Sequence, residues 1–130
     1  MKFTTIAALF VALYCASSFA QTGATSPLEV PSSFIGVWKV RWQGRTPLEA
    51  RLALTASGGT WKTSAHSLYN SCVGLKVPVF VESVSPEQIL LRLNFSVLRG
   101  CEDDKVVLTR VDEKTIEGKR GPLTLTLSRE

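Results

Sequence analysis

The sequence predicts an all-β fold, an eight-stranded antiparallel up-and-down barrel with one disulfide, with a two-sheet β-sandwich as the alternative. From Ile35 onward, short segments rich in Val, Leu, Thr and Trp alternate, about every 8–12 residues, with clusters of Gly, Pro, Asp and Ser. Within the segments apolar and polar side chains alternate, which is typical of a sheet with one buried and one wet face. We favour the barrel because closure removes the edges that a long meander would expose.

The first half of the barrel is predicted as four strands with apolar residues at every second position. Turn residues follow the first strand at 44–47 and the second at 57–59, whereas a longer loop, 67–75, follows the third. Pro78 cannot donate a ladder hydrogen bond, so we expect an edge or a bulge where it begins the fourth strand. The four predicted strands are 35–42, 48–55, 60–66 and 76–84.

The second half repeats the pattern around the strongest candidate strand, 88–98. Its alternation places five apolar side chains inward, namely Ile89, Leu91, Leu93, Phe95 and Val97. Turns are expected at 85–87, 112–114 and 121–122, and a second long loop at 99–104. The four predicted strands are 88–98, 105–111, 115–120 and 123–128.

Residues 1–20 are expected to be a cleaved secretory signal peptide. Met1-Lys2 gives a positive start, residues 6–15 an apolar run, and Ser18-Phe19-Ala20 a small-x-small cleavage site. The apolar run is too short for a membrane-spanning helix. We therefore expect a periplasmic or secreted protein with an N-terminal extended segment, 21–34, and a single barrel domain, 35–130.

The remaining chain is small and only modestly basic. Removing residues 1–20 takes away one of the 15 basic side chains and none of the 11 acidic ones. This balance argues against a strongly cationic nucleic-acid binder, and the length argues against several domains.

Two cysteines remain after cleavage, Cys72 and Cys101. An even number in an exported protein favours one disulfide over two free thiols. In an up-and-down barrel the third and fifth connections lie at the same end, so a bridge between these residues is allowed. On the chain-entropy account, closing the loop would stabilise the fold by about 3.5 kcal/mol. No Cys-x-x-Cys motif suggests a redox role.

One segment carries a family resemblance. The stretch Ser33-Phe34-Ile35-Gly36-Val37-Trp38 resembles the Gly-x-Trp signature of the calycins, the lipocalin and avidin-like barrels, and Arg129 matches the basic side chain that this family often places against the Trp. The resemblance implies structural roles for Gly36, Trp38 and Arg129 at a closed end of the barrel, with ligand entry at the other end.

A second resemblance concerns the turn after the second strand. Ser57-Gly58-Gly59-Thr60-Trp61-Lys62 resembles the loop of the small periplasmic lysozyme inhibitors, which are disulfide-containing eight-stranded barrels. This resemblance implies a protein partner in place of a small molecule.

Residue types that support catalysis or metal binding are sparse. His66 is the single histidine, and no second His or free Cys is predicted to share a metal with it. The acidic turn Glu102-Asp103-Asp104 lacks the Gly and the further oxygen ligands of a calcium loop. We therefore expect no enzyme activity, no cofactor and no metal.

Two functions remain open at this point. The loop end could bind a small apolar or amphipathic ligand, or the barrel could be filled by its own side chains while the loops bind a protein. The volume of the interior discriminates between them. Trp61 is the most open of the tryptophans, because polar and turn residues flank it. The candidate binding residues are Arg45, Trp61, Tyr69, Asn70, Arg99, Glu102 and Asp103.

Four basic side chains, Lys39, Arg41, Arg45 and Arg51, face outward on the first predicted hairpin. Such a run is typical of a solvated face. If it has a function, it favours an anionic surface such as lipid headgroups or polysaccharide, with binding that weakens in salt.

Overall fold

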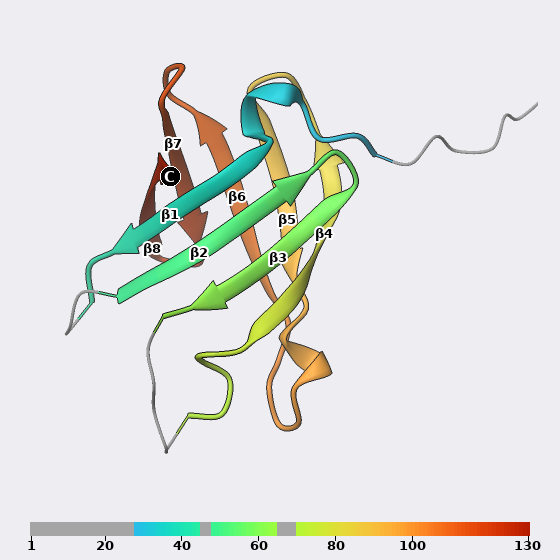
Figure 1. Ribbon diagram of the computed structural model, residues 1–130, viewed down its shortest axis with the longest axis vertical. Helices are drawn as coiled ribbons and strands as arrows, with labels where there is room; N and C mark the ends of the chain where they lie inside the picture. Colours follow the sequence, from blue (N-terminus) through green and yellow to red (C-terminus); the bar gives the residue numbers. More distant parts are fainter. Residues whose placement is uncertain (1–27, 45–47, 65–69) are drawn as a thin grey trace, which may run out of the picture.

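The chain forms a closed barrel of eight antiparallel strands, each paired with its neighbour in sequence, with β1 also paired to β8 (Figure 1). The computed structural model describes residues 28–44, 48–64 and 70–130. This confirms the predicted up-and-down barrel and excludes the sandwich. The strands are β1 (Gly36–Trp42), β2 (Leu48–Thr55), β3 (Gly58–Thr63), β4 (Lys76–Val84), β5 (Gln88–Leu93), β6 (Asp104–Arg110), β7 (Thr115–Arg120) and β8 (Leu123–Arg129).

The strand predicted over 88–98 is wrong in its second half. β5 ends at Leu93, and the chain continues as a short 3-10 helix, η2 (Phe95–Val97), in which Phe95 is buried but Val97 is 55% exposed. The last β4–β5 pair joins Val79 to Leu93, and the next residue of β4 is Pro78, whose carbonyl accepts a hydrogen bond from the Asn94 N–H. Pro78 has no N–H to return, so the ladder stops there.

The expected irregularity in β4 lies away from Pro78. The register between β4 and β5 shifts between Val81 and Ser83, whereas Pro78 itself lies opposite Thr60 of β3. Pro78 is tolerated without a bulge because β5 has already ended on the side that its missing N–H would face.

The inward side chains fill the barrel. Trp38 and Trp61 are 0% exposed, and the ring of Trp61 lies 6.1 Å from that of Trp42. At Gly118 of β7, a Cβ atom would lie 3.1–3.3 Å from Leu108 and Leu125, which is closer than ordinary van der Waals contact, so the packing there is tight. Within the described residues, a core of twenty buried hydrophobic side chains runs through the barrel. The barrel interior is therefore filled by side chains and is not a hollow ligand cavity.

The end of the barrel where β1 begins is closed by a second 3-10 helix, η1 (Ser32–Phe34), shown in blue at the top of Figure 1. The Trp38 indole N–H donates to the Phe34 carbonyl at 2.9 Å. Val30 and Phe34 are buried in the core. Part of the expected extended segment therefore packs onto the barrel. The sequence did not predict this, because only two isolated residues anchor the segment and two residues form no periodic pattern.

Arg129 completes this end. Its guanidinium lies 4.4 Å from the centre of the Trp38 ring and donates to the carbonyls of Ile35 and Ser33 at 2.9 and 3.0 Å. Gly36 has a φ of 134°, and a Cβ atom there would lie 2.8 Å from Arg129 Nη1. Arg129 therefore lies against both the Trp38 ring and the backbone at Gly36.

Among the described residues, no helix is long and apolar enough to cross a membrane.

Candidate functional site at the loop end

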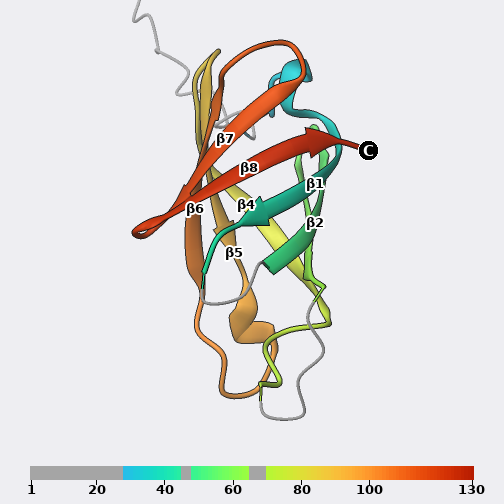
Figure 2. The ribbon, with the colours of Figure 1, turned by 90° about the vertical axis from the view of Figure 1, so that its left-hand side faces the viewer.

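The two longest connections meet at the end of the barrel opposite η1. Figure 2 shows the β3–β4 and β5–β6 connections together at the bottom of the molecule. The Cys72–Cys101 disulfide joins them across a Cα–Cα distance of 5.8 Å. This confirms the predicted bridge. It also brings residues of both loops to one mouth of the barrel.

An open pocket of about 780 Å³ lies at this mouth. Its apolar surface comes from strand ends and loops: Trp42 ends β1, Leu48 begins β2, Leu123 begins β8, and Phe95 lies in η2. Trp42 and Phe95 themselves belong to the buried core, so the pocket is a cup over the packed interior and not a channel through the barrel. Pockets of this volume hold small molecules in other proteins.

The wall of the cup contains a charge pair. Arg120 at the end of β7 donates to Asp104 at the start of β6. The guanidinium also lies 5.4 Å from the Phe95 ring centre and 5.9 Å from that of Trp61. Arg120 is thus fixed between a carboxylate and two aromatic rings. Its charge is balanced by Asp104, and both residues line the cup.

Asp103 supports the cup from outside. Its carboxylate accepts the backbone N–H of Ser96 at 2.9 Å and the Arg92 guanidinium at 3.2 Å. These bonds, the Ser96 backbone bond first, hold the pKa of Asp103 below its usual value because they favour the charged form. Asp103 therefore holds η2 in place, and with it the Phe95 ring.

The structure assembles only part of the predicted site. Asn70, Glu102 and both cysteines line the cup. Arg99 is exposed and Asp103 faces η2, so neither is among the lining residues. Trp61 is buried, which corrects its placement as the most open tryptophan. Arg45, Tyr69 and His66 lie outside the described residues.

Sequence reasoning missed most of the apolar surface. The predicted candidates are mostly polar side chains of the loops, whereas six of the fourteen described lining residues lie at strand ends. Most of these residues could have been found as inward-pointing positions next to the connections β1–β2, β3–β4, β5–β6 and β7–β8. Lining residues that the prediction lacked include Trp42, Leu48, Phe95, Arg120 and Leu123.

The turn that resembles the lysozyme-inhibitor loop lies at the other end. The carbonyl of Ala56 accepts the N–H of Val30 at 2.8 Å, which ties this turn to the segment before η1. The aromatic residue that follows, Trp61, points into the core and donates to Thr63 at 3.0 Å. The turn therefore does not present that ring on the surface.

No group of three or more His, Cys, Asp or Glu residues within 28–44, 48–64 and 70–130 is arranged to hold a metal ion. Every buried side-chain N or O atom in the same ranges has a hydrogen-bond partner.

Comparison of the chain with protein-family models, with curated proteins and with solved structures finds no match.

Proposed function

We propose that this protein is an exported binding protein without enzymatic activity, which takes a small amphipathic ligand at the loop end of the barrel. The open cup of about 780 Å³ carries the proposal, because its lining combines apolar and aromatic side chains with polar and charged ones. Trp42 and Phe95 supply aromatic surface for the apolar part of the ligand. Asn70, Glu102 and the Arg120–Asp104 pair supply hydrogen bonds for its polar part.

The packed interior limits how such a ligand sits. The interior below the cup is filled by wholly buried side chains, among them Leu52, Leu91 and Trp61. A long acyl chain therefore could not insert along the barrel axis. A compact ligand fits better, with its apolar face on the Trp42 and Phe95 rings and its polar groups toward the mouth.

The test fills the cup without touching the core. Val73 lines the pocket from the β3–β4 connection, and Val73→Trp places an indole there. Val111, which is 60% exposed and absent from the pocket lining, gives the matched control Val111→Trp. We expect the wild type and Val111→Trp to bind the amphipathic dye 1-anilinonaphthalene-8-sulfonate, and Val73→Trp to lose at least about tenfold in affinity, about 1.4 kcal/mol.

The dye titration is read together with urea unfolding of all three proteins. No saturable dye binding by the folded wild type would contradict the proposal. Equal dye binding by Val73→Trp and Val111→Trp would place the dye elsewhere and would also contradict it.

The packed interior supports a second candidate, a protein partner held by the two loops. Leu75 and Val97 are 53% and 55% exposed on the two connections that the disulfide joins. Exposed apolar side chains on adjacent loops are suited to a protein interface. In its most specific form, this candidate function is inhibition of lysozyme. A lysozyme assay that shows no loss of lysozyme activity at excess protein would contradict that form.

Export is part of the proposal and has its own measurement. Protein isolated from outside the cytoplasm should have the intact mass of a chain that begins at Gln21 and carries one disulfide. A mass that retains residues 1–20 would contradict cleavage at the predicted site.

A further inference from the structure

The outer wall of the barrel carries a row of four basic side chains in direct register. Lys39 of β1 lies opposite Arg51 of β2, Arg51 lies opposite Lys62 of β3, and Lys62 lies opposite Lys76 of β4. Each points outward, because its strand neighbours Trp38, Leu52, Trp61 and Val77 are buried. The sequence pointed only to the basic face of the first hairpin. The row across four strands is a product of the register.

Such a row is unfavourable for folding by itself. Like charges directly opposite each other on one face destabilise a sheet. Lysines that protect a sheet edge from aggregation are one explanation for exposed charges, but a closed barrel has no edge here. The row therefore calls for another role.

Among the residues that the structure describes, several cations elsewhere on the outer wall are paired with carboxylates, whereas three of the four in this row are not. Glu82 on β4 accepts ion pairs from both Arg92 and Lys105, at 3.4 and 3.0 Å. In the row, Arg51 pairs with Glu130 at 2.9 Å. Within the described residues, no carboxylate lies within ion-pair distance of Lys39, Lys62 or Lys76.

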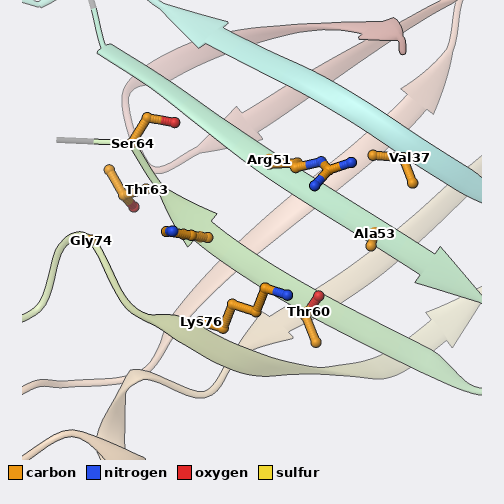
Figure 3. Close-up of a pocket in the computed structure, with 9 residues that line it drawn as sticks. Val37, Arg51, Ala53, Thr60, Thr63, Ser64, Gly74 and Lys76 are labelled. Atoms are coloured by element: carbon orange, nitrogen blue, oxygen red, sulfur yellow. The ribbon is translucent and has the colours of Figure 1, made fainter.

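A hollow of about 540 Å³ accompanies the row. Arg51, Lys62 and Lys76 line it together with the hydroxyl side chains of Thr60 and Ser64. Figure 3 shows Arg51 on β2 and Lys76 on β4 on the two sides of the strand that carries Thr60. Ala53 and Gly74 carry small or no side chains, which leaves this part of the wall concave.

We propose that this wall binds a strand of acidic polysaccharide laid across β1 to β4. Neighbouring strands are about 4.8 Å apart, so the four cations form a line of about 15 Å. A polymer with regularly spaced carboxylates or sulfates can meet several of them at once, and its hydroxyl groups can bond Thr60 and Ser64. The hollow is not shaped for a planar lipid surface. Its lining contains no aromatic ring on which a nucleic-acid base could stack.

The experiment measures binding of the purified protein to polygalacturonate, a uronic-acid polymer, with neutral dextran as the blank. Lys62→Gln with Lys76→Gln removes two charges from the row. Lys114→Gln with Lys119→Gln removes two charges from exposed positions outside it, so the two double variants have equal net charge. We expect the row variant to bind at least about tenfold more weakly, the control to stay within about twofold, and wild-type affinity to fall between about 50 and 200 mM salt.

Two further measurements separate binding from folding and from other anions. Without polymer, the row variant should unfold at the same or a higher urea concentration than the wild type, because like-charge pairs are removed. It should also bind the dye as the wild type does, since neither Lys62 nor Lys76 lines the cup. Equal weakening by both double variants, no binding to polygalacturonate, or preferential binding to anionic phospholipid vesicles or single-stranded DNA would overturn the proposal.

Discussion

The two ends of the barrel are built differently. At the end closed by η1, the Trp38 indole bonds to Phe34, and Arg129 covers the Trp38 ring and bonds two backbone carbonyls. At the loop end, the Trp42 ring borders an open pocket, and a disulfide holds two long connections around it. One tryptophan of β1 therefore serves each end: Trp38 is enclosed, and Trp42 is at the floor of a cup.

This difference indicates a division between stability and binding. Side chains at the closed end are satisfied by partners within the chain, so changes there should act on folding. Side chains at the loop end leave space beside them, so changes there should act on ligand binding.

Trp38→Ala should have the largest effect on stability. The ring is wholly buried, and truncating such a residue typically lowers the free energy of unfolding by about 3–5 kcal/mol. Trp42→Ala should lower it less, because the removed atoms border a pocket that is already open, but it should remove most of the dye binding. Urea unfolding followed by circular dichroism, together with dye titration, measures both. Equal losses of stability for the two variants would break the comparison.

Removing the disulfide should weaken the loop end and leave the closed end intact. The bridge spans 29 positions in sequence, and the chain-entropy account gives a loss of about 3.5 kcal/mol for Cys72→Ser with Cys101→Ser. Dye binding should fall as well, because both cysteines line the cup. Wild-type protein unfolded in a reducing agent should approach the stability of the variant. A variant that keeps wild-type dye affinity would show that the bridge does not shape the cup.

The smallest effect is expected from Asp103, and it depends on pH. The backbone N–H of Ser96 lowers the pKa of Asp103, so the charged carboxylate stabilises the folded state at neutral pH. That contribution is lost as pH falls below the usual aspartate value of about 4. Wild type should therefore be more stable than Asp103→Asn at pH 7, and the difference should shrink toward pH 3.

Asp112 provides the matched control for this prediction at the other end of the barrel. Its pKa is also lowered, first by the backbone N–H of Lys114, in the turn between β6 and β7. Asp112→Asn should show the same pH dependence of stability in urea unfolding. Only Asp103→Asn should also weaken dye binding, because Asp103 holds η2 and the Phe95 ring. Equal dye affinity of the two variants would contradict the inference that η2, held by Asp103, shapes the cup.

The sequence by itself was sufficient for the order of the strands and for the buried face of most of them. Alternation every second residue fixes which face of a strand is buried, so β2, β4 and β7 match the predicted bounds residue for residue. The disulfide followed from an even cysteine count and from the rule that odd connections share an end. Alternation could not reveal where β5 ends, since the pattern continues to Val97 while the pairing partner stops at Pro78.

What only the tertiary structure decided is which residues come together from different strands. Trp42, Phe95 and Arg120 are separated by more than fifty and then by twenty-five positions, and only closure of β8 onto β1 and the fold of η2 bring them to one cup. The row from Lys39 to Lys76 likewise exists only through the pairing register of four strands. Periodicity along the chain determines the face on which a side chain lies. Register and closure determine its neighbours, because those depend on how far each strand slides against the next.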